Sequence, residues 1–220
     1  MNGGWQFTAD SFSVTNLTVQ QMLFNAYDLK MDGQLIGLPK WGDTDRWDIQ
    51  AKIGDEAQQA MHKLNRLQYT NEIQLMLQNL LVQRFQLKSH SETRELPIYD
   101  LTIAKNGLKL KAAASENPVK WSAGWSMGSG KFTGKEVDFA SLAKALSSCD
   151  DVSRIVVDKT GLTEKYDVHL KWTPDGQQET ADSGPSIFTA LEEQLGLKLV
   201  PAKGPVDVIV VDHIELPSEN

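Results

Sequence analysis

The chain has few of the features that mark disulfide-bonded, zinc-binding or membrane-spanning proteins. Cys149 is the only cysteine among 220 residues, which excludes an intramolecular disulfide and a cysteine-based zinc cluster. Its neighbours Asp150 and Asp151 disfavour a thiolate, so we interpret Cys149 as a small residue that closes a helix. No apolar run approaches the roughly 20 residues that cross a bilayer, and no signal region opens the chain.

Positive charge is also scarce. The 22 lysines and arginines are outnumbered by 29 aspartates and glutamates, which gives a net charge of -7. No basic run or stripe occurs, so the electrostatic footprint of a nucleic-acid-binding protein is missing. Hydrophobic residues make up 40% of the chain and charged residues 23%, which is ordinary for a folded globular protein. We therefore expect neither a nucleic-acid partner nor a membrane span.

The common catalytic signatures are absent as well. The sequence has no Gly-x-Ser-x-Gly elbow and no His-Glu-x-x-His pair. The run Gly-Trp-Ser-Met-Gly-Ser-Gly at 124–130 lacks the lysine of a phosphate loop, so it is interpreted as a linker or a hairpin turn. No two of the four histidines share a close metal-ligand spacing. We expect no catalytic residues, no metal and no cofactor.

What the sequence does contain is the same supersecondary unit twice. Five apolar helix positions recur at a constant offset of 120: Leu17, Val19, Met22, Leu23 and Ala26 match Val137, Phe139, Leu142, Ala143 and Leu146. The segment 42–52 then recurs as 161–171 at an offset of 119. Within it, Trp47 matches Tyr166 and Asp48 matches Asp167. A duplication explains architecture without naming a substrate.

Each copy has the predicted order strand–helix–strand–helix–strand–strand. Two helices on one face of a small mixed sheet is the expected packing, so the fold class is α+β. The predicted organisation is a first repeat at 5–110, a connector at 111–130 and a second repeat at 131–216.

Several local elements follow from capping and turn residues. Asn16 or Thr15 is expected to cap a helix over 17–27, and Asp138 and Ser186 are expected to cap later helices. A hairpin is expected around 93–95. The end of the chain is predicted to form two further strands, at 197–200 and 206–214.

The string Val-Val-Asp-Lys-Thr-Gly at 156–161 is the most suggestive of function. Asp158 and Lys159 could hold a nucleophile, a phosphate or a ligand. Alternatively, these residues form a turn, with Gly161 in a left-handed conformation. The matching place in the first repeat, 39–42, keeps the glycine and drops the aspartate, which favours the turn.

Two arginines and three tryptophans are further candidates for a binding surface. Arg84 and Arg94 lie near carboxylates such as Glu95, where they could form a buried polar staple or bind an anionic ligand; the staple is favoured. Trp41, Trp121 and Trp125 are predicted in loops or the connector. They either belong to a recognition surface or plug the ends of the two sheets.

The combined motifs resemble a known family. The strings that carry the resemblance are Arg-Phe-Gln-Leu-Lys-Ser-His at 84–90, Glu-Thr-Arg-Glu-Leu-Pro-Ile-Tyr at 92–99, Val-Val-Asp-Lys-Thr-Gly-Leu-Thr at 156–163, Tyr-Asp-Val at 166–168, Glu-Gln-Leu-Gly-Leu-Lys-Leu at 193–199 and the end, 211–220. They resemble a soil-associated, mostly acidobacterial family of uncharacterised proteins. Members usually follow a secretion signal, and some follow a BlaR-type metallopeptidase sensor domain.

That resemblance implies an exported protein, in the periplasm or at the cell surface, whose signal segment lies outside this sequence. Members usually begin with a further strand that this chain lacks, which implies either an open sheet edge or a sequence trimmed at its start. The run Leu-Glu-Glu-Gln-Leu-Gly-Leu-Lys-Leu at 191–199 is also similar to the short N-terminal domain of secretins and TonB-dependent receptors.

Three functions are consistent with these observations. The first is a non-catalytic extracytoplasmic interaction module that binds an envelope protein, because edge strands accept a partner strand through main-chain hydrogen bonds. The second is a sensor domain that binds a small molecule or peptide between the repeats. The third, a hydrolase that uses Asp158 and a histidine, requires those side chains within hydrogen-bond reach.

Overall fold

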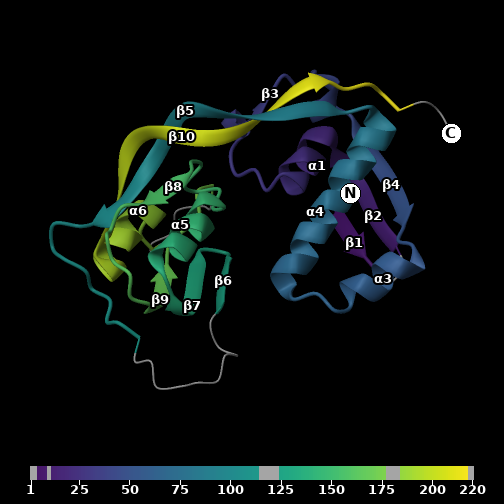
Figure 1. The fold of residues 1–220 in the computed structure, drawn as a ribbon. Helices are drawn as coiled ribbons and strands as arrows, with labels where there is room; N and C mark the ends of the chain where they lie inside the picture. The colour runs from purple at the N-terminus through teal and green to yellow at the C-terminus, as the bar shows by residue number, and fades with distance from the viewer. Residues whose placement is uncertain (1–3, 9–10, 114–123, 177–183, 218–220) are drawn as a thin grey trace. The chain divides into compact units, whose positions relative to one another are not determined.

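The computed structural model describes residues 4–8, 11–113, 124–176 and 184–217, apart from the side chains of Phe7, Arg66 and Leu67. The chain divides into two compact units (Figure 1). Unit 1 comprises Met1–Arg94 and Asp207–Asn220, and unit 2 comprises Glu95–Val206. Both combine helices with small sheets, so the chain is α+β as its sequence predicts. No helix in the described part of the chain is both long and apolar enough to cross a membrane.

Unit 1 is built on a three-stranded antiparallel sheet of order β1-β2-β4, made by β1 (Gly4–Phe7), β2 (Ser11–Thr18) and β4 (Arg46–Lys52). The helices α1 (Val19–Ala26) and α4 (Arg66–Phe85) pack against this sheet (Figure 1). Their shared core contains the buried side chains Phe12, Val14, Leu23, Leu77, Leu81 and Phe85.

The shorter elements of unit 1 connect these pieces. They are the 3-10 turn η1 (Asp32–Gln34), β3 (Leu35–Ile36), α2 (Trp41–Thr44) and α3 (Asp55–Met61).

The start of α1 differs from the sequence prediction. Thr18 caps the helix through the Gln21 amide, and the Gln21 side chain accepts from the Thr18 amide in return. The predicted caps, Asn16 or Thr15, both lie in β2 instead. Asn16 lies in the bulge of that strand with a φ of 56°, and its backbone amide donates to the Asp48 carboxylate at 2.7 Å. An asparagine tolerates this left-handed conformation better than most residues, which explains its place there.

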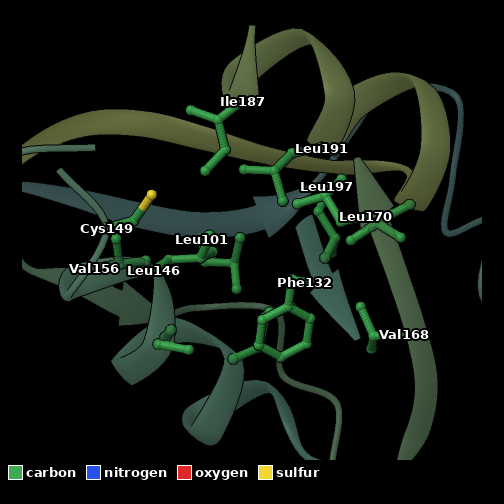
Figure 2. Close-up of a cluster of buried hydrophobic side chains, with 14 of the residues drawn as sticks. Leu101, Phe132, Leu146, Cys149, Val156, Val168, Leu170, Ile187, Leu191 and Leu197 are labelled. Carbon is green, nitrogen blue, oxygen red and sulfur yellow. The ribbon is translucent and has the colours of Figure 1, made fainter. Parts of the chain in front are cut away.

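Unit 2 has a sheet of the same order, β6-β7-β9, made by β6 (Gly124–Gly128), β7 (Lys131–Val137) and β9 (Tyr166–Lys171). Helix α5 (Phe139–Ser147) begins at the predicted cap Asp138. Helix α6 (Ile187–Ala190) begins at the predicted cap Ser186 and runs into the π-helical turn η2 (Leu191–Leu195). Figure 2 shows the core, in which Leu101, Phe132, Leu146 and Leu191 come from four different elements.

Strands β5 (Lys88–Ile103) and β10 (Leu197–His213) each pass from one unit into the other. They are neighbours in a four-stranded sheet of order β3-β10-β5-β8, where β8 is Val156–Asp158. β3 pairs in parallel with the end of β10, and β8 pairs in parallel with β5.

The predicted hairpin at 93–95 is therefore wrong, as is the predicted division of the last strand. Thr93, Arg94 and Glu95 supply none of the residues that favour tight turns, so the chain continues as a strand. The prolines at 201 and 205 fit an extended backbone and do not end β10.

Paired details of the two three-stranded sheets agree at the offsets found in the sequence. Trp5 stacks on Phe12 with ring centroids 5.6 Å apart, and Trp125 stacks on Phe132 at 5.8 Å. Glu136 repeats the bulge of Asn16, with a φ of 50° and an amide that donates to Asp167 at 3.0 Å. The two sequence repeats, 5–110 and 131–216, stay a prediction about the history of the chain. The range 111–130, predicted as a connector, contains strand β6.

Candidate functional site

The side chains predicted to bind a ligand are distributed over both units. Trp41, Arg84 and Arg94 belong to unit 1, and Trp125, Asp158 and Lys159 belong to unit 2. Trp121 lies outside the described residues. Trp125 is 45% exposed on β6, where it stacks on Phe132.

Trp41 is a core contact of unit 1. It opens α2 and stacks on the buried Phe85, with the ring centroids 6.4 Å apart and the planes at 16°. Deleting the loop around Trp41 would therefore disturb packing together with any surface that the loop forms.

Asp158 and Lys159 form a turn at the end of β8. The carboxylate of Asp158 accepts hydrogen bonds from the Thr160 amide at 2.9 Å and from its hydroxyl at 2.8 Å. Gly161 follows with a φ of 72°, the left-handed conformation expected for a turn glycine. The Lys159 amide donates to the carbonyl of Leu101 at 2.9 Å, which ties the turn to β5.

Arg94 belongs to an exposed charged network on the surface of unit 1. Its guanidinium pairs with Glu92 at 2.8 Å, and Glu92 also accepts from His90 Nε2 at 3.1 Å. His90 Nδ1 lies 2.8 Å from Asp212 on β10. The sequence favoured a buried staple with Glu95; the structure shows a surface ion pair with Glu92, because alternate residues of a strand share a face.

This network predicts a measurable pH dependence. Hydrogen bonds to Asp212 and then to Glu92 raise the pKa of His90 above its ordinary value of 6.5, because the protonated ring donates from both nitrogens. Since the folded pKa exceeds the unfolded one, this contribution to stability is complete below pH 6.5 and is lost as the pH rises through the folded pKa. We expect an NMR titration midpoint above 6.5, which Asp212→Asn lowers.

Asp207→Asn is the matched control for that titration. Asp207 also lies on β10, but its carboxylate accepts from the Thr93 hydroxyl at 2.8 Å. The explanation fails if Asp207→Asn moves the midpoint of His90 as far as Asp212→Asn does.

The most distinctive surface feature of unit 1 is a groove beside β4. β4 lies at one edge of its sheet, with β2 on one side (Figure 1), and no described strand pairs with its other side. A hollow of about 800 Å³ follows this free edge. Its walls are Trp47–Gln50 of β4, Gln83–Gln86 at the end of α4, and the segment Glu215–Pro217 after β10. We call this hollow the β4 groove.

Aromatic packing and charge define the chemistry of the β4 groove. Trp47 meets Phe85 edge to face, with centroids 5.4 Å apart and planes at 88°. The indole Nε1 of Trp47 is buried and is the one fully buried side-chain polar atom without a hydrogen-bond partner among the described residues. Such a donor loses free energy until it meets an acceptor. Arg84 adds an exposed guanidinium at the same place.

The corresponding edge in unit 2 is closed by the chain itself. Ala112 forms an antiparallel bridge with Tyr166, and the Ala113 amide donates to the carbonyl of Lys165 at 2.8 Å. At the other end of β9, the side chain of Gln194 bonds both backbone groups of Lys171, at 3.0 and 2.7 Å. The edge of β9 in unit 2 is thus covered, whereas the edge of β4 in unit 1 borders a groove.

Of the predicted candidates that the structure describes, only Arg84 lines the β4 groove, while Trp41 stacks on Phe85, which does line it. Sequence reasoning missed Trp47 and Glu215. The sequence signal that could have identified Trp47 was its match with Tyr166, because a large aromatic residue on an alternating strand marks a half-buried face.

Metal ligands and a reactive thiol are two further kinds of chemistry for which the described residues can be searched. No group of three or more histidine, cysteine or acidic side chains suited to a metal occurs in the described ranges. Burial, above all, raises the pKa of the Cys149 thiol; a hydrogen bond with the Asp151 backbone opposes this effect, and the charges of Asp151 and Asp150 add to it. The thiol is therefore protonated at neutral pH and is a poor nucleophile.

The fold and the groove define a two-unit α+β protein whose first unit has a strand edge that no described strand covers, bordered by aromatic and charged side chains. The chain belongs to the family described as "Protein of unknown function (DUF3738)", whose model matches residues 20–214. No curated protein and no solved structure matches the chain.

Proposed function

We propose that this protein is a non-catalytic, extracytoplasmic interaction module that takes an extended segment of an envelope protein on the free edge of β4. The observation that carries the proposal is the contrast between the two edges. In unit 2 a segment of the same chain pairs with Tyr166, whereas the β4 groove borders Trp47. An added strand would gain main-chain hydrogen bonds along β4 and an apolar contact with Trp47.

The surface of β4 suits a selective partner. Arg46, Asp48 and Lys52 are exposed along the strand, and charges on an edge strand discourage indiscriminate pairing. Between them, the half-buried Trp47 and Ile49 offer apolar contacts. A partner therefore needs both an extended backbone and side chains that fit this alternation.

Site-specific crosslinking tests the proposal. A photoreactive amino acid at Gln50, which is exposed in the β4 groove, should form an adduct with an envelope polypeptide in cell-envelope extract. The control position is Leu75, which is 51% exposed on α4 and does not line the groove. A synthetic peptide of the crosslinked segment should then slow hydrogen exchange of the β4 amides.

The proposal fails if Gln50 and Leu75 yield the same adducts, or if the peptide leaves the β4 amides unprotected. It also fails if Gln50 yields no polypeptide adduct while the photoreactive chain is folded and is labelled efficiently by a bulk crosslinker.

A second candidate function, small-molecule sensing, is favoured by a different hollow in unit 1. It has a volume of about 480 Å³ and lies between α1 and α4. Its apolar walls include Trp5, Phe24 and Ile73. A saturable rise in melting temperature with an apolar envelope metabolite, abolished by Ile73→Trp, would favour this function.

A further inference from the structure

Helix α4 extends beyond the core of unit 1. Counting back from the left-handed helix ends Gln86 and Gly196, Leu77 corresponds to Ile187, the residue at which α6 begins. Leu77 and Ile187 are each 2% exposed and belong to the cores of their units. Because α4 begins at Arg66, its turns before Leu77 are additional to the helix of unit 2.

These additional turns form one wall of the hollow between α1 and α4. Tyr69, Ile73 and Gln74 line the hollow from α4. None of the described side chains of α4 before Leu77 belongs to the core of unit 1. A helix in a protein draws most of its stability from a packed apolar face. Turns that border a hollow instead of a core are explained if the hollow holds a ligand.

Aromatic rings dominate the walls of this hollow. Trp5 of β1, Phe24 of α1 and Tyr69 of α4 all line it. The indole of Trp5 is held by stacking on Phe12, with ring centroids 5.6 Å apart and planes at 24°. Such walls favour a flat ring system, because stacked and edge-to-face rings gain more than the area they bury. The volume of about 480 Å³ lies in the range of small-molecule sites.

Lys30 adds a cation to the wall of the same hollow. Its side chain is only 18% exposed, and its ammonium pairs with Asp28, whose side chain is 46% exposed. An ammonium has three N–H donors, so the pair with Asp28 leaves capacity for a second anionic group. Because Lys30 is more withdrawn from water than Asp28, the hollow favours an added negative charge over an added positive one.

Building on the second candidate function, we infer that the hollow between α1 and α4 binds an aromatic carboxylate. The ring system lies among Trp5, Phe24 and Tyr69, and the carboxylate accepts a hydrogen bond from the ammonium of Lys30. The edge of β4 takes no part in this binding, so the inference is independent of the interaction module.

Binding of three small probes to the full chain tests this inference. The probes are naphthoate, its neutral counterpart naphthamide, and the aliphatic carboxylate octanoate. We expect naphthoate to shift the indole N–H resonance of Trp5 saturably in NMR spectra, and to bind at least about fivefold more tightly than the other two probes. The resonance of Trp125 is the internal control, because Trp125 stacks on Phe132 in unit 2 as Trp5 stacks on Phe12.

Three variants locate the binding site. Lys30→Gln should remove the preference for naphthoate over naphthamide. Lys40→Gln should keep that preference, because Lys40 is an exposed lysine of unit 1 that does not line the hollow. Ile73→Trp should block all three probes by filling the hollow.

The outcomes separate this inference from the second candidate function. Equal affinity for naphthoate and naphthamide, equal affinity for naphthoate and octanoate, or an unchanged preference in Lys30→Gln overturns the inference. In these cases, binding that Ile73→Trp blocks leaves the second candidate function standing. The inference is also overturned if no probe shifts Trp5. The second candidate function falls with it only if no apolar metabolite raises the melting temperature in a way that Ile73→Trp abolishes.

Discussion

Gly196→Ala should destabilise unit 2 by about 3 kcal/mol or more, because two costs coincide at this position. Gly196 ends η2 with a φ of 70°, a left-handed conformation that alanine disfavours. A Cβ there would also lie 2.0 Å from the carbonyl oxygen of Gly107 and 2.9 Å from the amide nitrogen of Lys109. Both atoms are backbone, so neither can move aside by a change of rotamer.

Gly161→Ala is the matched control for the steric part of this cost. Gly161 has nearly the same φ, 72°, but a Cβ there would meet no atom within 4 Å. It should therefore lose only about 1 kcal/mol, from backbone strain alone. The free energy of unfolding is measured by urea denaturation of each variant, and hydrogen exchange assigns the loss to a unit. Similar losses in the two variants would contradict the role of the close approach.

The same substitution bears on the closed edge of β9. Gly107 and Lys109 begin the segment that leads to the bridge between Ala112 and Tyr166. If Gly196→Ala displaces that segment, the amides near Tyr166 should exchange faster than in Gly161→Ala. Unit 1 shows that the conformation itself is tolerable, since Gln86 adopts a φ of 51° at the matching helix end. The close approach is what requires glycine in unit 2.

Local features of the fold were predictable because they depend on neighbouring residues. Asp138 and Ser186 cap helices as predicted, since a side-chain oxygen needs only the amide three residues later. The same reasoning misplaced the first cap, because Asn16 was drawn into a bulge by Asp48, which is 32 residues away. A bulge partner on another strand leaves no local signal in the sequence.

The candidate site could not be predicted because it depends on which strand lies at an edge. β4 and β9 have closely similar sequences, and both alternate apolar and polar residues. One borders a groove and the other is closed by Ala112, a difference produced by segments more than fifty residues away. Arg84 was identified from its charge, but Trp47 acquired its importance only through sheet order and the geometry of its indole.

Phe85→Ala should destabilise unit 1 by about 3–5 kcal/mol, the usual loss for a buried phenylalanine. Phe85 is 1% exposed, and its ring contacts both Trp41 and Trp47. Removing the ring leaves a cavity between these two indoles and the core of unit 1. Leu75→Ala on the same helix should lower the free energy of unfolding by no more than about 0.5 kcal/mol, apart from the difference in helix propensity, because Leu75 is 51% exposed.

The free energy of unfolding is measured by urea denaturation monitored through tryptophan fluorescence. Hydrogen exchange then separates the contributions of the two units. Unit 1 amides should lose protection in Phe85→Ala, while those around Phe132 in unit 2 should retain it, because the two side chains belong to different cores. A loss near that of Leu75→Ala would mean that the indoles close over the vacated space. Trp41 and Trp47 would then preserve the packing beside the β4 groove without the ring of Phe85.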